Sequence, residues 1–131
     1  MASWQEIIAH IESQYTMTRM GENMIALTFG FQDGRSQALA IAYAPTVGPM
    51  PAHIKFFSQI GDRKKLKRKL GDILEESGDY PFGVTCLGNW VGVVHTALAD
   101  TIDAPEIDVP LELLAGVADE LERRFTGGDE F

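Results

Sequence analysis

The chain has 131 residues, 45% of them hydrophobic, which is the size and composition of one ordinary domain. A formal net charge of −8 argues against a general nucleic-acid binder, because such proteins need a basic face. The single cysteine, Cys86, excludes an internal disulfide and fits a reducing compartment. No stretch has the pattern of a signal peptide or of a membrane span, so we expect a cytoplasmic protein.

The N-terminal half of the sequence predicts one helix followed by three strands. Residues 3–15 carry apolar side chains at helical spacing, and Ser3 and Glu6 are spaced as a capping box. The apolar pattern then changes to the alternation of strands, which we expect at 24–31, 36–44 and 53–60. Asp33-Gly34 suits the hairpin turn between the first two strands. The prolines of 45–51 predict a loop.

The C-terminal half predicts a helix, a second hairpin and a last helix. The first of these helices is expected from Asp62, as its cap, to about Ser77, with a buried stripe formed by Leu66, Leu70, Ile73 and Leu74. Strands are expected at 82–87 and 90–99. A loop follows, and Pro110 fits the first turn of the last helix. The apolar residues of that helix are Leu111, Leu114, Ala118, Leu121 and Phe125.

This order, α-β-β-β-α-β-β-α, predicts an α+β fold in which helices flank an antiparallel sheet. No linker divides the chain, so we expect a single domain over residues 1–126 and a disordered tail over 127–131. The tail ends in GGDEF, which is also the signature of diguanylate cyclases. In those enzymes the signature lies on a turn between two strands, whereas here it follows a predicted helix, so we interpret the match as chance.

The chain offers few candidates for catalysis or metal binding. The histidines, His10, His53 and His95, have no second ligand type at the spacing of a metal site. Cys86 has no neighbouring base that would activate it as a nucleophile. There is no glycine-rich phosphate loop. We therefore predict a non-enzymatic protein with no catalytic residues, no metal and no cofactor.

The basic residues are concentrated in one segment. Six of the eleven lysines and arginines lie within residues 62–72: Arg63, Lys64, Lys65, Lys67, Arg68 and Lys69. If these residues occupy the first turns of a helix, they oppose the helix dipole, which favours acidic residues there. Two interpretations stay open. Either the acidic C-terminal part of the same molecule pairs with the segment, or an acidic partner does.

The C-terminal third resembles the YbjN-like proteins, which share the fold of type III secretion chaperones. The likeness is carried by residues 90–125, where a strand and a polar loop precede a helix with the pattern Leu114, Ala118, Asp119, Leu121 and Glu122. The order of elements resembles that group along nearly the whole chain. The resemblance implies a small binding or regulatory module, often dimeric, without a cofactor. The leading helix lacks the leucine- and glycine-rich pattern of secretion chaperones.

We therefore expect a protein-binding or chaperone-like regulatory module of the bacterial cytoplasm, with a protein partner and a homodimer as a further expectation. The expected partner-binding residues are Arg63, Lys64, Lys67, Arg68, Trp4 and Trp90, because a basic rim and tryptophan anchors often serve contact surfaces. The alternative is a sensor of an anion or nucleotide held by the basic segment. Nucleic-acid binding is disfavoured by the net charge, and no membrane association is expected.

Overall fold

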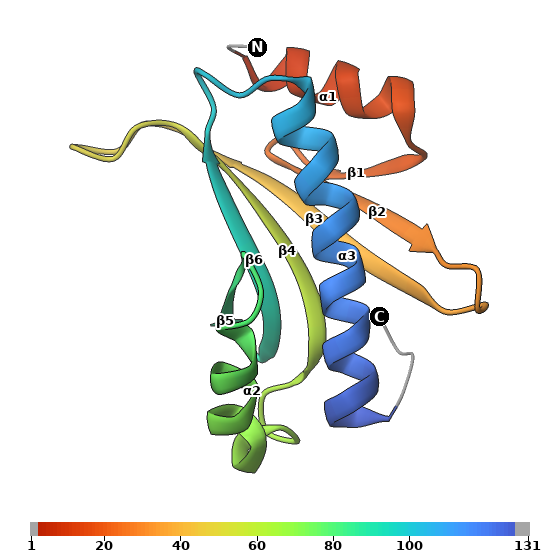
Figure 1. The fold of residues 1–131 in the computed structure, drawn as a ribbon. Coiled ribbons are helices and arrows are strands. Elements are labelled where there is room, and N and C mark those ends of the chain that lie inside the picture. The colour runs from red at the N-terminus through yellow and green to blue at the C-terminus, as the bar shows by residue number, and fades with distance from the viewer. Residues whose placement is uncertain (1–2, 128–131) are drawn as a thin grey trace.

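The computed structural model describes residues 3–127, and its chain forms a sheet with helices against it (Figure 1). The elements in chain order are α1 (Trp4–Gln14), β1 (Met17–Gly21), β2 (Met24–Gly30), β3 (Ser36–Ala44), β4 (His53–Asp62), the 3-10 turn η1 (Lys67–Lys69), α2 (Leu70–Ser77), β5 (Gly83–Leu87), β6 (Trp90–Leu98) and α3 (Ala104–Thr126). Within the described residues the six strands form one antiparallel sheet in the order β1-β2-β3-β4-β6-β5. The α+β class with an antiparallel sheet is therefore confirmed.

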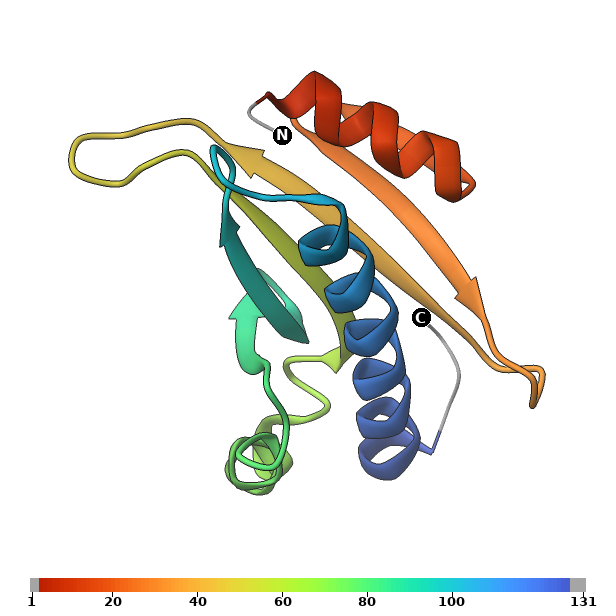
Figure 2. The ribbon, with the colours of Figure 1, turned by 45° about the horizontal axis from the view of Figure 1, so that its top comes forward.

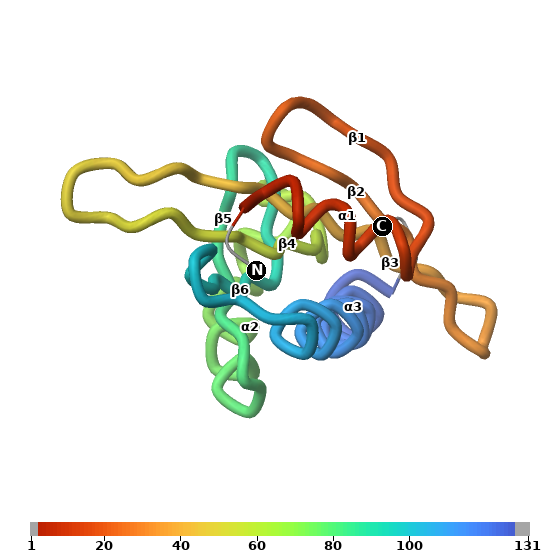
Figure 3. Tube along the Cα trace, turned by 90° about the horizontal axis from the view of Figure 1, so that it is seen from above, coloured from red at the N-terminus to blue at the C-terminus, as the bar shows by residue number. Residues whose placement is uncertain are grey.

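The helices pack on one face of this sheet. α3 lies along β3, β4 and β6 (Figure 2). α1 belongs to the same layer, since His10 Nε2 lies 2.9 Å from Asp108 Oδ1 on α3. α2 reaches the other end of α3 through the ion pair between Glu76 and Arg124. Figure 3 shows the loop between β3 and β4 projecting away from this body.

A single apolar core lies between the helices and the sheet. Its strand residues share one parity, because alternate side chains of a strand point to the same face. They include Ile25, Leu27, Leu39, Ile41, Ile54 and Phe56. The helices contribute Ile7, Ile11, Leu111, Leu114, Ala118 and Leu121, each of them fully buried. The predicted stripes of the first and last helices thus lie in the core, with Phe125 partly buried beside it.

The structure has one strand that the sequence pattern did not predict. β1 pairs with β2 from Met17↔Leu27 to Gly21↔Met24 and forms an edge of the sheet. Its sequence, MTRMG, places only Met17 against the core and leaves the other side chains exposed. Four exposed residues of five give no alternating pattern, so pairing with β2 rather than local periodicity defines this strand.

The predicted helix over 62–77 was too long. β4 continues to Asp62, whose carboxylate Oδ1 accepts hydrogen bonds from the N–H groups of Lys64 at 2.8 Å and Lys65 at 3.2 Å. This turn and η1 precede the α-helix, so the basic residues do not occupy its first turns and the helix-dipole argument does not apply to them. The predicted stripe is also wrong in part, since Leu74 is exposed.

α3 begins earlier than predicted. Asp103 caps it by accepting a hydrogen bond from the Glu106 N–H at 2.9 Å, and Pro105 fits the first turn. Pro110, expected at the start, lies inside the helix. Gly127 ends the helix at φ 71°, a left-handed conformation that glycine adopts readily. The remainder of the predicted tail lies outside the described residues.

Candidate interaction surface

The second face of the sheet carries no helix within residues 3–127. The strand residues that alternate with the core residues point to it, and most of them are small or apolar. The floor of this face is formed by Ala26, Ala38, Ala40, Ala42, Phe57 and Val94. Its rim consists of large apolar side chains that stay exposed: Met20, Met24, Leu87, Trp90 and Leu98. We call floor and rim together the bare sheet face.

The floor contains a hollow of about 180 Å³ beside the ring of Phe57. It is lined by Ala26, Ala38, Leu39, Ala40, Phe57 and Gln59. The hollow exists because alanine methyl groups leave space next to a large aromatic ring. Phe57 is 8% exposed, although it lies on the uncovered face. Its ring packs against Gly92, where an added Cβ would lie 2.4 Å from the ring carbon Cζ.

The rim makes the bare sheet face unusual for a protein in water. Isolated exposed apolar side chains are normal on protein surfaces, but a contiguous apolar patch marks an interaction site. Here five large apolar residues border a floor of alanines on the same face. Trp90, the first residue of β6, is 36% exposed and lies opposite Asp62, the last residue of β4. Tryptophan in such a position often contributes strongly to binding energy.

The bare sheet face also lacks free negative charge. The chain has 19 acidic residues, yet the strand alternation places only Asp62 on this face. The Asp62 carboxylate already accepts the N–H groups of Lys64 and Lys65. Lys55 is the basic residue of the central strands on this side. The face is therefore neutral to basic on a molecule whose net charge is −8.

The basic segment begins where β4 ends, next to the bare sheet face. The N–H of Arg63 donates to the carbonyl oxygen of Asn89 over 2.7 Å, which joins the segment to the β5–β6 turn. A second hollow, of about 310 Å³, is lined by Arg63, Lys64, Lys67, Leu70 and Asn89. Arg68 does not line it, although it lies in the same segment. Trp90 follows Asn89 directly, so the structure brings it close to the basic residues.

The other predicted tryptophan lies elsewhere. Trp4 is 6% exposed, its ring stacks on that of Tyr43 with centroids 5.7 Å apart, and its Nε1 donates to the Glu22 carbonyl oxygen at 2.8 Å. These contacts place Trp4 in the core beneath α1. We therefore do not include it in the candidate surface.

The C-terminal helix meets the basic segment through one main-chain oxygen. Lys69 Nζ donates to the carbonyl oxygen of Phe125 near the end of α3 over 2.7 Å. Within residues 3–127, Arg63, Lys64 and Lys67 form no ion pair. Within residues 3–127 no acidic side chain forms an ion pair with the basic segment, so the contact of Lys69 with a main-chain oxygen is not the charge pairing that the first interpretation expects.

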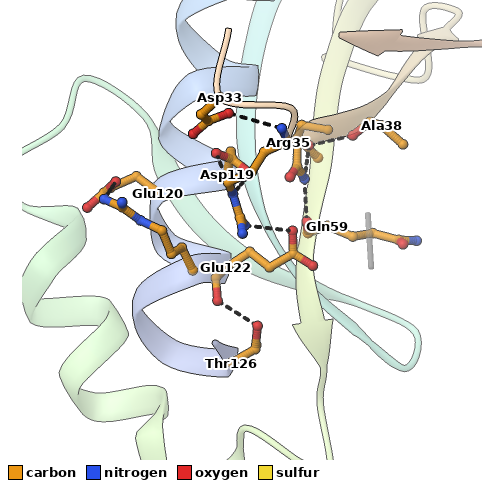
Figure 4. Close-up of polar contacts among 11 residues, drawn as sticks. Asp33, Arg35, Ala38, Gln59, Asp119, Glu120, Glu122 and Thr126 are labelled. Atoms are coloured by element: carbon orange, nitrogen blue, oxygen red, sulfur yellow. Dashed lines mark hydrogen bonds and ion pairs between the residues drawn. The ribbon is translucent and has the colours of Figure 1, made fainter. Parts of the chain in front are cut away.

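A buried polar network holds α3 on the sheet (Figure 4). Arg35 extends from the β2–β3 turn, and its Nε donates to both carboxylate oxygens of Asp119, at 2.9 and 3.2 Å. Glu122 is 1% exposed and its Oε1 lies 3.9 Å from the Arg35 guanidinium. Beside them Gln37 donates to Ser58 Oγ at 2.8 Å. Neither hollow is lined by these residues, so we assign the network to packing.

The predicted histidines and cysteine are separated in the structure. His95 packs between the rings of Phe56 and Phe82, and burial lowers its pKa below the usual 6.5. His10 pairs with Asp108, His53 Nδ1 lies near the Pro51 carbonyl oxygen, and Cys86 is exposed on β5. In the part of the chain that the structure describes, no group of three or more His, Cys, Asp or Glu residues is placed to hold a metal ion.

Sequence reasoning proposed the basic segment and Trp90 as contact residues and did not include the floor of the bare sheet face. A signal for it exists in β3, where Ala38, Ala40, Ala42 and Ala44 alternate with larger apolar residues. A strand that is apolar on both of its faces is covered on both or carries a binding surface on one of them.

Across the described residues, no helix has the length and apolar composition needed to cross a membrane.

Comparisons with known proteins give a fold. No family model and no curated protein matches the sequence. Among solved structures, a chain of the crystal structure of the ExsC–ExsE complex is similar, with a TM-score of 0.63 over 95% of this chain and 97% of that chain, at 9% sequence identity. At this identity the likeness concerns the fold alone. The chain therefore has the secretion-chaperone-like α+β fold that its order of elements predicted.

Proposed function

We propose that this protein is a non-enzymatic binding module that holds an extended segment of a partner polypeptide across the bare sheet face. The observation that carries the proposal is a six-stranded sheet with one face covered by all three helices and the other apolar and uncovered in the described residues. Leaving such a face in water costs free energy, because apolar surface gains about 25 cal/mol per Å² on burial. Binding a partner recovers that free energy.

The surface indicates the chemistry of the partner segment. An extended chain suits a sheet face, because its alternate side chains point to one side. The hollow of about 180 Å³ suits an aliphatic side chain inserted beside Phe57. The face carries no free carboxylate and continues into Arg63, Lys64, Lys67 and Arg68, so acidic residues at one end of the segment find complementary charge. Trp90, between the apolar floor and the basic segment, is the proposed anchor.

The similar solved structure supports this proposal. It is a complex of two proteins, ExsC and ExsE, and one of its chains shares the fold described here. A fold that occurs in such a complex is suited to holding a partner, although fold alone does not define function. Membership of the YbjN-like group, a homodimer and a cytoplasmic location remain predictions from the sequence.

The test is selection of peptides from a random display library on the immobilised full chain. We expect enrichment of extended sequences with aliphatic residues and acidic residues near one end. The selected peptides should bind an Ala38→Glu variant at least about tenfold more weakly, because the new carboxylate occupies the apolar hollow. Ala38 is exposed, so the variant is expected to fold.

The matched control is Ala9→Glu, the same substitution at an exposed position of α1. This variant should bind the peptides as the wild type does. Equal loss in both variants would show that added negative charge, rather than the site, weakens binding. Equal binding to wild type and to Ala38→Glu would contradict the proposed surface.

A further inference from the structure

We propose that the hollow lined by Arg63, Lys64, Lys67, Leu70 and Asn89 is a binding site for phosphoryl groups. This inference goes beyond the partner-binding function and does not depend on it. It concerns a discrete anion site at the junction of β4, η1, α2 and the β5–β6 turn. The ligand class is a compound with two or more negative charges on phosphate oxygens.

The cations of the hollow lie on an anchored turn. The Asp62 carbonyl oxygen accepts the Leu66 N–H at 3.0 Å, while the Asp62 side chain accepts the N–H of Lys64 at 2.8 Å. Leu66 is 2% exposed, which fixes the middle of the segment in the core. On the opposite side the Arg63 N–H binds the Asn89 carbonyl oxygen at 2.7 Å. A backbone held in this way limits the entropy lost when a ligand binds.

The charge of the hollow is not balanced from within the described part of the chain. Arg63, Lys64 and Lys67 line one cavity and form no ion pair there. Two nearby basic residues do have partners, because Lys69 binds the Phe125 carbonyl oxygen and Arg124 pairs with Glu76. Lys65 and Arg68 also form no ion pair within residues 3–127, but they do not line the hollow. Three cations around one hollow repel one another, and an anion at the centre turns this repulsion into attraction.

The wall of the hollow adds two features that suit phosphate. Asn89 brings a side-chain amide that can donate to a phosphate oxygen, and Arg63 offers a fork of N–H donors. Leu70, at the start of α2, supplies the apolar part of the wall. A volume of about 310 Å³ lies at the lower limit of ligand pockets, enough for a small phosphorylated compound.

Phosphoryl groups reach such a site from two sources, a free compound such as a nucleoside diphosphate or a phosphorylated side chain of a polypeptide. The first probe is pyrophosphate, titrated by calorimetry into the full chain at constant ionic strength. We expect the wild type to bind pyrophosphate saturably. A Lys64→Gln/Lys67→Gln variant should lose about tenfold in affinity for each of its two missing lysines. The matched control is Lys65→Gln/Arg68→Gln, which removes the same charge from exposed residues outside the hollow.

The control variant should keep its affinity for pyrophosphate. Equal weakening in both double variants would overturn the site, because it would indicate diffuse attraction to a basic segment. An absence of saturable binding to the wild type would overturn it as well. ADP and a phosphoserine peptide then distinguish the two sources, and tighter binding of either one than of pyrophosphate supports the site with that source. The Ala38→Glu variant should bind pyrophosphate normally, so failure of this inference is distinct from failure of the proposed function.

Discussion

Replacing Gly92 by alanine should destabilise the protein, although a glycine in a strand is usually the weaker residue. An added Cβ would lie 2.4 and 2.5 Å from two ring carbons of Phe57 and 2.6 Å from the Ser58 carbonyl oxygen. Normal carbon contacts are about 3.5–4.0 Å. The ring can rotate away, but the carbonyl oxygen belongs to the paired strand β4 and moves only with the backbone. Overpacking of this kind costs about 1–3 kcal/mol.

The assay is equilibrium denaturant unfolding followed by circular dichroism, with thermal unfolding alongside. For a chain of this size the expected loss corresponds to a fall in Tm of roughly 4–10 °C. Gly83→Ala is the matched control, because a Cβ there meets only Val94 Cγ1, at 3.7 Å. That control should be neutral, or stabilising by about 0.5–1 kcal/mol. If Gly92→Ala proved as stable as Gly83→Ala, the packing described for Phe57 and the hollow beside it would be wrong.

The remaining predictions concern partly buried polar groups. Burial lowers the pKa of His95 below 6.5, so the folded state binds fewer protons than the unfolded state. The free energy of unfolding should therefore fall as the pH drops below 6.5. In denaturation curves, His95→Gln should flatten that dependence on pH. Burial, followed by the charge of a neighbouring carboxylate, raises the pKa of Tyr15 from 10.0 to about 12. The free energy of unfolding should therefore fall as the pH rises between these two values. Tyr15→Phe should remove this part of the pH dependence. Arg35→Met removes the guanidinium beside Asp119 and Glu122 and should cost about 3 kcal/mol in urea unfolding, whereas an unchanged midpoint would contradict the assigned packing role.

The elements defined by local pattern could be predicted from the sequence. The hairpin of β2 and β3 and the apolar stripe of α1 follow from alternation, from helical spacing and from the Asp33-Gly34 turn. β1 could not, because its one core residue leaves no periodic signal and its place depends on pairing with β2. The start of α2 was misplaced because the Asp62 carboxylate organises a turn and 3-10 segment instead of an α-helix.

The candidate surface was only partly predictable for a similar reason. A run of six basic residues is visible in the sequence, but the fold decides that Arg63, Lys64 and Lys67 line one hollow with Asn89 from a distant turn. Trp4 and Trp90 are chemically equivalent in the sequence, and only the packing of α1 against Tyr43 separates the core residue from the surface residue. Which of the two alternating sets of side chains on each strand faces the helices likewise depends on tertiary packing.

The measurement that tests the proposed function most directly is methyl NMR on protein labelled at alanine, with a selected peptide added. Alanine methyl groups report on separate places: Ala26, Ala38 and Ala40 line the hollow of the bare sheet face, whereas Ala9 lies on the exposed side of α1 and Ala118 in the core. Binding across the bare sheet face predicts large shifts for the three methyl groups of the hollow and none for Ala9. Shifts confined to Ala9, or unchanged signals from the hollow at saturating peptide, would show that the partner binds elsewhere and would contradict the proposal.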